Sequence, residues 1–299
     1  MGDTPLTEIE KLGELVCYES STAEQALERV KGFDVAIVNK IIVNDEFLDA
    51  ACPTLKMVCE AGTGINNIDV EACQKRGVLV RNVAGYSTDS VAQMTWMHIL
   101  MLSGHAFYYR DKVMSGSYSA GNVHTDPQNP FSELVGKTIG IVGMGAIGRQ
   151  VAKVAEAFGM KVIYYSTSGT SHCTDYPSVS IEELLSQSDV VSINAPYNNR
   201  TAGLIDYGKM KLMKPSAIIV NTGRGGIAVE EDLAKAIDNE VIAGVGLDVY
   251  IREPLPKDSP LLRTKFPQRV SLTPHTAWQS IEARGRLAAE MANNIKELL

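Results

Sequence analysis

Short apolar runs alternate with amphipathic segments along most of the chain, which has 299 residues. In the first third, three continuous apolar runs have the length of strands that are covered on both faces. They occupy 33–39, 55–61 and 78–83. Three segments with helical spacing and plausible caps occupy 22–32, 44–52 and 67–77. Strand and helix repeated in this order predict a parallel sheet wound by right-handed crossovers.

A second series of the same kind begins at Lys137. Before it come a long helical pattern from Ser87 to about Gly116 and a polar, Gly/Asn/Pro-rich loop or arm at 115–130. The strands predicted for the second series lie at 137–143, 161–166, 189–196, 217–223, 241–249 and 269–273. Its helices are predicted at 145–159, 180–188, 229–239 and 280–299. The pattern therefore predicts an α/β protein of two doubly wound parallel-sheet domains with a helical bridge.

Composition narrows the class of protein. The net charge is −7 and no run of Lys or Arg appears, so a nucleic-acid-binding surface is not expected. The most apolar long segment, 91–109, is interrupted by polar residues, which favours a buried helix over a membrane span. The five cysteines have no CxxC spacing and no accompanying His cluster, so we expect no metal site and reduced thiols in a cytoplasmic protein.

A glycine-rich loop opens the second series. The run GIVGMGAIGR places Gly143, Gly145 and Gly148 in G-x-G-x-x-G register, with a predicted strand before and a predicted helix after it. This context is typical of a dinucleotide-binding turn, in which the free N–H groups and positive dipole end of the helix face the phosphates. A tight turn without a nucleotide is the structural alternative. The expected cofactor-binding residues of this loop are Gly143, Met144, Gly145, Ala146, Ile147 and Gly148.

Three later predicted strands are followed by residues that could take part in catalysis or binding. Arg224 follows one, Glu253 and Asp248 follow the next, and His275 follows the last. The C-terminal ends of parallel strands are where open α/β sheets bind ligands. Each residue alone has an ordinary structural explanation, such as a surface ion pair or a solvated carboxylate, so only their combination indicates a site.

These motifs in this order resemble the D-isomer-specific 2-hydroxyacid dehydrogenase family. The matching segments are GMGAIG, NTGRGG, LDVYIREPLP and TPHTAW, together with EAGTGINNID and NVAGYSTDSVAQ. The last of these and PHTAW are similar to the glycerate dehydrogenase and hydroxypyruvate reductase branch. The resemblance implies a Rossmann nucleotide-binding domain at 94–275 and a flavodoxin-like substrate domain at 1–93 plus 276–299. It also implies a homodimer.

By resemblance, the enzyme transfers a hydride between NAD(P)H and a small 2-keto acid, such as hydroxypyruvate or glyoxylate. His275 would donate the proton, Glu253 would orient it and favour its charged form, and Arg224 would polarise the carbonyl and hold the carboxylate. Backbone N–H groups at Thr63 and Gly64 would bind the other carboxylate oxygens. For Lys40 and Trp278, packing and contact with the substrate are equal alternatives. The substrate-binding set is therefore Thr63, Gly64, Lys40, Arg224 and Trp278.

The resemblance also places residues around the cofactor. Asp248 and the backbone of Ala277 would meet the nicotinamide carboxamide, and Ala195 and Pro196 would border the adenosine. The remaining expected contacts are Ser166, Thr167, Thr222 and Gly223. Between Lys161 and Thr174 no Asp or Glu is present to hold the ribose diol of NAD, and no Arg is present to bind a 2′-phosphate. We therefore expect weak discrimination, with NAD(H) used and NADP(H) tolerated or comparable.

The start of the chain departs from the family. Residues 1–12 are typical of the helix that follows the first strand, and 14–18 of the second strand. We expect the first strand to be missing from inside the sheet, which leaves its neighbours without a backbone partner. A chain extended upstream should then be more stable.

Three other functions are compatible with the sequence. A phosphoglycerate dehydrogenase shares the scaffold, although no added basic cluster for a phosphate is visible. A nucleotide-sensing binding protein, similar to the C-terminal binding protein corepressors, could keep the same Arg, Glu and His. An inactive fragment would follow from the missing strand. Turnover of NADH or NADPH with 2-keto acids separates these possibilities.

Overall fold

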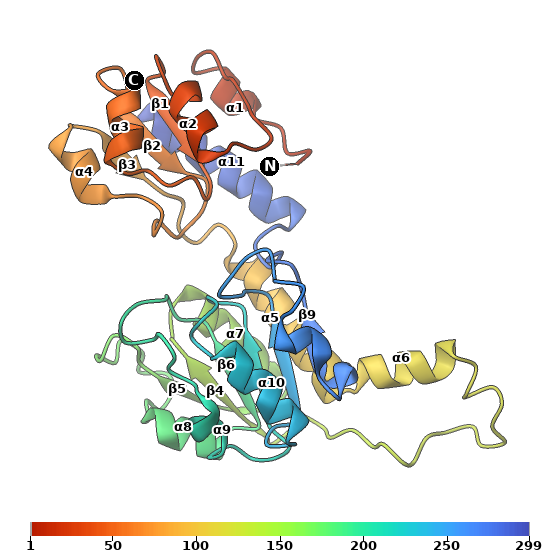
Figure 1. The fold of residues 1–299 in the computed structure, drawn as a ribbon. Coiled ribbons are helices and arrows are strands. Elements are labelled where there is room, and N and C mark those ends of the chain that lie inside the picture. Colours follow the sequence, from red (N-terminus) through yellow and green to blue (C-terminus); the bar gives the residue numbers. More distant parts are fainter. Residues whose placement is uncertain (1, 299) are drawn as a thin grey trace. The chain divides into compact units, whose positions relative to one another are not determined.

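The computed structural model describes residues 2–298 (Figure 1). The chain divides into two compact units. The first contains Met1–Ser87 and Gln279–Leu299, and the second contains Thr88–Trp278. The second unit is therefore inserted as one block into the sequence of the first. Its two ends are joined by a hydrogen bond of 2.6 Å from the hydroxyl of Ser90 to the carbonyl oxygen of Ala277.

The first unit is built on a parallel sheet with the strand order β1-β2-β3. The strands are β1 (Val35–Val38), β2 (Met57–Glu60) and β3 (Leu79–Arg81). The helices are α1 (Thr7–Glu10), α2 (Ala23–Arg29), α3 (Asp45–Ala51), α4 (Val70–Lys75) and α11 (Ile281–Lys296). Side-chain caps start four of them, at Thr22, Asn44, Asp69 and Ser280. Phe47, Leu48 and Val58 lie in the core between sheet and helices.

The strand predicted at 14–18 is not formed, so that prediction is wrong. These residues are extended coil, and Val16 and Tyr18 are 41% and 50% exposed. Among residues 2–298, β1 pairs only with β2, so no strand lies beside 14–18 for its backbone to join. An apolar groove separates this segment from β1 and includes Val16, Val30 and Ile37 in its lining.

The second unit is built on a six-stranded parallel sheet with the order β5-β4-β6-β7-β8-β9. Its strands are β4 (Thr138–Val142), β5 (Lys161–Tyr165), β6 (Val190–Ile193), β7 (Ile218–Asn221), β8 (Gly244–Leu247) and β9 (Val270–Leu272). Two buried apolar clusters cover the two faces of this sheet. The predicted doubly wound parallel-sheet fold is confirmed. It brings the loops after β4 to β9 to one edge of the sheet, because all six strands are parallel.

The helices of this unit complete the crossovers. They are α5 (Thr88–Ser103), α6 (Ala106–Met114), α7 (Ala146–Ala157), α8 (Ile181–Gln187), α9 (Tyr207–Met210) and α10 (Glu230–Asp238). Two 3-10 turns, η1 (Pro260–Arg263) and η2 (Pro267–Arg269), precede β9. No helix in the described part of the chain is long and apolar enough to cross a membrane.

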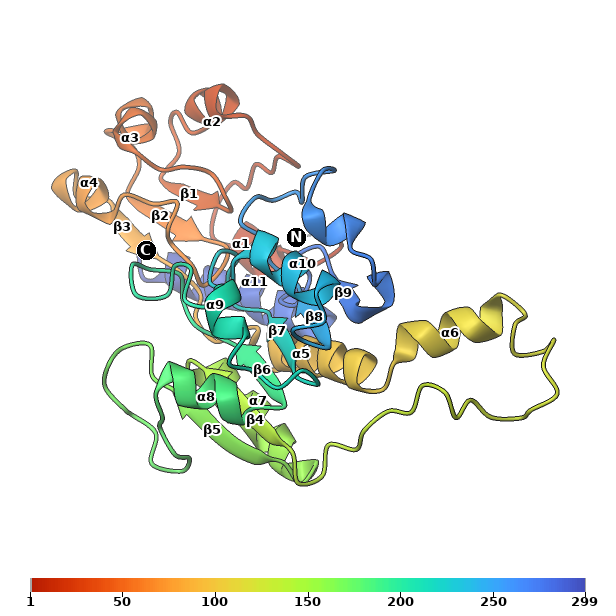
Figure 2. The same ribbon diagram turned by 60° about the horizontal axis from the view of Figure 1, so that its bottom comes forward.

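The long helical pattern from Ser87 to Gly116 is two helices rather than one. The break is at His105, whose φ of 51° is left-handed and cannot continue a helix. α6 and the irregular segment after it extend away from the rest of the second unit (Figures 1 and 2). Large apolar side chains are exposed along this arm, at Val113, Met114, Val123, Phe131 and Val135.

Candidate active site

The glycine-rich loop joins β4 to α7, as the sequence predicts. Gly143 has a φ of 94°, and a Cβ there would lie 3.0 Å from the Cα of Ala195. At Gly148 a Cβ would lie 2.3 Å from the carbonyl oxygen of Gly143, whereas at Gly145 it would meet nothing within 4 Å. Gly143 and Gly148 therefore lie where the loop packs against other backbone atoms, whereas the space at Gly145, before the first turn of α7, is open. α7 has no side-chain cap at Gly145, so the N–H groups of its first turn stay available for an anion. The residues fit the pyrophosphate of a dinucleotide.

The loop after β5 forms a tight polar turn. The hydroxyls of Ser166 and Ser168 donate hydrogen bonds to the carbonyl oxygen of Thr170, at 2.6 and 3.0 Å. A residue that the sequence analysis missed lies against this turn: Arg200, from the loop after β6, donates from Nη1 to the carbonyl oxygen of Ser168 at 2.6 Å. Thr167 belongs to the turn, while buried Ala195 and exposed Pro196 begin the loop that carries Arg200. Local sequence around the turn contains no signal for this contact.

Arg224 lies in a loop held by Asn221, the last residue of β7. The Asn221 side chain donates to the carbonyl oxygen of Arg224 at 2.8 Å and accepts from the N–H of Gly223 at 3.0 Å. The neighbouring Gly225 is sterically required, since a Cβ there would lie 2.0 Å from the carbonyl carbon of Tyr250. The Arg224 guanidinium donates to the carbonyl oxygen of Gly223 at 2.8 Å and is half-buried. Nearby, Thr222 is buried, and its hydroxyl is 2.7 Å from that of Thr95.

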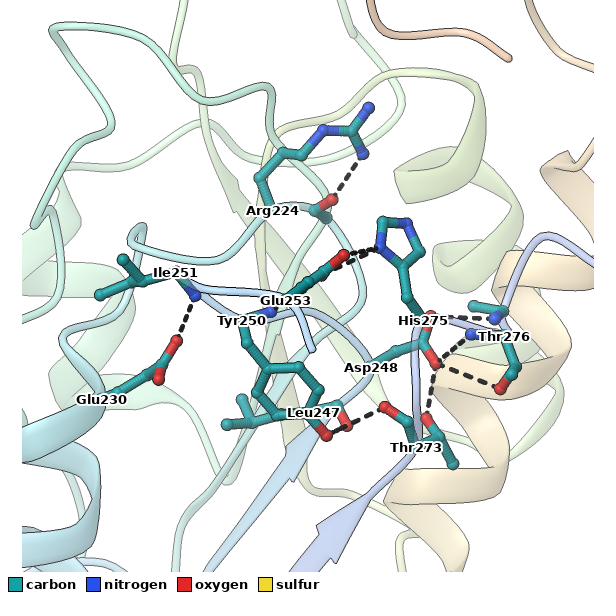
Figure 3. Close-up of polar contacts among 12 residues, drawn as sticks. Arg224, Glu230, Leu247, Asp248, Tyr250, Ile251, Glu253, Thr273, His275 and Thr276 are labelled. Atoms are coloured by element: carbon teal, nitrogen blue, oxygen red, sulfur yellow. Dashed lines mark hydrogen bonds and ion pairs between the residues drawn. The ribbon is translucent and has the colours of Figure 1, made fainter. Parts of the chain in front are cut away.

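His275 and Glu253 form the pair that the sequence predicts. Nδ1 of His275 lies 2.7 Å from Oε2 of Glu253, and the side chains are 30% and 22% exposed. Within residues 2–298, no group is hydrogen-bonded to Nε2 of His275, so that nitrogen is available to a ligand. His275 has a φ of 55°, a left-handed conformation that is uncommon for a side chain of this size. In Figure 3 the side chains of Arg224 and His275 both project to the same side of the loop that carries Glu253.

Asp248 holds the loop that carries His275. Its carboxylate is 1% exposed. It accepts hydrogen bonds from the Thr273 hydroxyl at 2.6 Å and from the N–H groups of Thr276 and Ala277 at 2.8 and 2.9 Å (Figure 3). The expected contact of Asp248 and Ala277 with the nicotinamide carboxamide stays a prediction, because here these two residues bond to each other. The sequence suggested no structural role for Asp248.

Two further buried groups support the same loops, and neither was identified from the sequence. His98, on α5, lies 2.7 Å from the hydroxyl of Ser271 and 3.2 Å from that of Thr273. Burial lowers the pKa of His98 to about 4, so the ring is neutral at pH 7. Glu230, at the start of α10, accepts a hydrogen bond from the N–H of Ile251, and burial raises its pKa.

The other predicted substrate residues lie elsewhere in the chain. Thr63 and Gly64 belong to the first unit, in the turn after β2, and their backbone N–H groups make no hydrogen bond within the described residues. The turn is fixed by the Thr63 hydroxyl, which donates to Val83, and by Asn82, which donates to the Thr63 carbonyl at 2.7 Å. Lys40 is exposed at the end of β1 with a φ of 61°. Trp278 is half-buried at the end of the second unit.

Comparison with known proteins decides the family. Residues 96–277 match the family model of the D-isomer specific 2-hydroxyacid dehydrogenase, NAD binding domain. The chain belongs to the D-isomer specific 2-hydroxyacid dehydrogenase family. Dehydrogenases of this family are oxidoreductases that transfer a hydride between a nicotinamide cofactor and a 2-keto or D-2-hydroxy acid, so this chain is a nicotinamide-dependent dehydrogenase of that class.

Three similar proteins illustrate the range of the family. A hydroxypyruvate reductase of Blautia hydrogenotrophica is 33% identical over 303 residues, which span 100% of this chain and 93% of the relative. A D-lactate dehydrogenase from Aquifex aeolicus, solved with NAD and lactic acid, matches with a TM-score of 0.86 at 28% identity, over 98% of this chain and 90% of the other. An acyclic imino acid reductase solved with NADPH and D-Arg matches with a TM-score of 0.87 at 30% identity, over 98% and 92%. Solved structures similar to this chain thus include one that holds NAD and one that holds NADPH.

Proposed function

We propose that this family dehydrogenase reduces a small 2-keto acid, with hydroxypyruvate and glyoxylate as the leading substrates and NADH or NADPH as the hydride donor. The observation that carries the proposal is the His275–Glu253 pair, whose Nε2 is free on the side toward which Arg224 projects. An imidazole with one nitrogen held by a carboxylate and the other free can deliver a proton to a substrate oxygen.

His275 acts as the general acid in this proposal. Glu253 accepts a hydrogen bond from the Nδ1–H group of His275, which leaves Nε2 facing the substrate and stabilises the charged ring. A nicotinamide held beside these residues would supply the hydride to the carbonyl carbon. Nε2 of His275 gives its proton to the carbonyl oxygen, and the neutral ring regains a proton from water. The C=O bond becomes CH–OH, and one hydride and one proton account for the two hydrogens added.

Arg224 polarises the carbonyl and binds the substrate carboxylate. Its planar guanidinium can contact both groups, and only one of its N–H donors is used within the loop. The Asn221 clamp fixes the backbone that carries it. The free N–H groups of Thr63 and Gly64 are suited to the remaining carboxylate oxygen. Lys40 and Trp278 are proposed to border the substrate side chain.

The cofactor would be held by the glycine-rich loop and by the loops after β5 and β6. The N-terminus of α7 would take the pyrophosphate, Ser166 and Thr167 would contact the adenosine ribose, and Ala195 and Pro196 would border the adenosine. Near the nicotinamide we place Thr222, Gly223, Asp248 and Ala277. This assignment follows the order of loops along one edge of the sheet.

The arm is proposed to form a homodimer. Its exposed apolar side chains include Met114 at 77%, Phe131 at 60% and Val135 at 71% exposure, and several exposed apolar side chains on one segment are typical of a protein–protein interface. Sedimentation equilibrium tests the dimer directly. Charged substitutions at Met114 and Phe131 should then yield a monomer.

Turnover tests the function. Oxidation of NADH and NADPH is followed at 340 nm with hydroxypyruvate, glyoxylate, pyruvate and larger 2-keto acids, at roughly millimolar concentrations because KM values commonly lie at or below that level. We expect the highest kcat/KM with hydroxypyruvate or glyoxylate. An absence of turnover with every keto acid would contradict the proposal and would favour a binding protein.

A further inference from the structure

The turn after β5 cannot recognise the ribose of NAD in the usual way. Between Lys161 and Thr174 no Asp or Glu is available to bind the 2′- and 3′-hydroxyls or to repel a 2′-phosphate. The hydroxyl protons of Ser166 and Ser168 are directed to the carbonyl oxygen of Thr170. The N–H groups of Thr167 and Ser168, in contrast, form no hydrogen bond within residues 2–298. The turn therefore offers backbone donors but no charge of its own.

Arg200 supplies a positive charge at this turn. Its Nη1 donates to the carbonyl oxygen of Ser168 at 2.6 Å and would lie 3.4 Å from a Cβ placed on Gly169. The loop that carries it is set by Asn198, whose side chain accepts from the N–H of Arg200 at 2.9 Å. The Arg200 side chain is exposed and forms no ion pair with a carboxylate of residues 2–298. Within the same residues its guanidinium makes one hydrogen bond, to Ser168, so its other N–H groups are available to a ligand.

We propose that Arg200 binds the 2′-phosphate of NADP(H), so that this enzyme binds NADP(H) more tightly than NAD(H). A guanidinium presents N–H donors in a planar fork that matches phosphate oxygens, and the free N–H groups of Thr167 and Ser168 lie in the same turn. Because no carboxylate is present there, a phosphate meets no repulsion. This inference rests on the proposed function for its cofactor class and adds the residue that chooses between the two cofactors.

Arg200 could instead serve only to staple the β5 turn through its bond to Ser168. The two roles differ in what a substitution changes. A residue that only fixes the turn supports the adenosine site for both cofactors, so its loss weakens the binding of NADH and NADPH alike. A residue that binds the 2′-phosphate contacts only NADP(H), so its loss weakens the binding of NADPH alone.

Calorimetric binding separates these roles without depending on turnover. Four ligands are titrated: NADPH, NADH, 2′,5′-ADP and 5′-AMP, the last two being adenosine fragments with and without the 2′-phosphate. The variants are Arg200→Ala, Arg200→Lys and Arg200→Glu. Arg263→Ala is the matched control, because it also removes one exposed positive charge of the same unit and Arg263 makes no hydrogen bond or ion pair with the described residues of the turn.

In the unmodified protein, 2′,5′-ADP should bind about tenfold more tightly than 5′-AMP, and NADPH more tightly than NADH. Arg200→Ala should lower the affinity for the two ligands with a 2′-phosphate, NADPH and 2′,5′-ADP, by about tenfold. Arg200→Lys should lower it by less and Arg200→Glu by more, while the affinities for NADH and 5′-AMP change little. The preference should shrink as salt is raised, since the contact is exposed. Arg263→Ala should leave all four affinities unchanged.

Two results would overturn the inference while leaving the proposed function intact. One is equal weakening of NADH and NADPH by Arg200→Ala, and the other is a 2′-phosphate that brings no gain in the unmodified protein. If neither NADH nor NADPH binds, the proposed function fails as well, and this outcome is distinct from the other two.

Discussion

The two sheets of this protein differ in how completely their strands are covered. In the second unit, β6, β7 and β8 are buried at every position and have strands on both sides. In the first unit, three of the four residues of β1 are only half-buried, and the free edge of the strand borders a groove. Arg224 and Glu253 follow the well-covered strands β7 and β8. His275 follows the edge strand β9, and the hydrogen bonds from the N–H groups of Thr276 and Ala277 to buried Asp248 fix the loop that carries it.

The largest expected difference between the two units is in catalysis, and one substitution in each unit tests it. His275→Ala should lower kcat by about a hundredfold to ten-thousandfold, because the general acid is lost. Lys40→Ala should change kcat little and raise KM several-fold, because Lys40 is proposed only to border the substrate. Steady-state kinetics with each keto acid measure both. A near-normal kcat for His275→Ala would refute the assignment of the acid, and a collapse of kcat in Lys40→Ala would place chemistry in the first unit.

Matched truncations compare the two cores. Ile219→Ala in β7 removes a fully buried side chain and should cost about 2–5 kcal/mol of unfolding free energy, through lost burial and a cavity. Ile37→Ala in β1 removes a half-buried side chain beside the groove and should cost clearly less, about 1 kcal/mol. Urea unfolding followed by circular dichroism gives both values. Equal costs would mean that β1 is as well covered as β7.

Low pH should lower the stability of the second unit, because unfolding allows His98 to take up a proton. Its folded pKa is lowered to about 4 from 6.5, so the folded state binds fewer protons between these values, and stability falls as pH falls from about 6.5 to 4. The full loss is about 3 kcal/mol, from a shift of that size. In His98→Gln this loss should disappear, although the variant is less stable at pH 7. Denaturant titrations at several pH values provide the check, and an unchanged acid slope would count against it.

The smallest expected effect is in the first unit, where a fall in pH should raise the stability rather than lower it. Glu60, at the end of β2, is 3% exposed, accepts a hydrogen bond from Asn67, and has a pKa raised by burial. A raised carboxyl pKa means that the folded state holds its proton more tightly, so stability increases as pH falls through the folded pKa toward the unfolded value near 4.5.

Glu60→Gln should therefore stabilise the protein at pH 8, by about 1 kcal/mol, and have less effect near pH 5. Amide hydrogen exchange assigned to β2 reports the change within this unit. Because Gln keeps an oxygen acceptor for Asn67, a loss of stability at pH 8 would indicate that the ionised carboxylate has a role of its own.

Much of the fold could be predicted because each element carries its own local signal. Continuous apolar runs predicted all nine strands of the described chain, and capping residues such as Thr22 and Asn44 mark helix starts. The strand at 14–18 failed because its sequence has strand character but the fold gives it no neighbour to pair with. The break at His105 also went unnoticed, because Gly104 is the only local signal.

The site could be predicted only where a residue follows a strand directly. Arg224, Glu253 and His275 do so, and the parallel sheet brings their loops to one edge. The hydrogen bonds that fix these loops were not predicted, since their partners are distant in sequence: Asp248, expected only as a cofactor contact, accepts from Ala277, and Glu230 accepts from Ile251. Arg200 lies 32 residues from Ser168, and no periodicity or motif signals a contact between two irregular loops.

The hydrogen bond between Ser90 and Ala277 has a consequence for how such enzymes can diversify. It brings together the two ends of a block of sequence that contains all six strands of one sheet. An insertion with adjacent ends can be exchanged as a cassette, with the host chain continuing on either side. Recombination at these two points would join the block that carries Arg224, Glu253 and His275 to a different host sequence without interrupting the sheet that positions them.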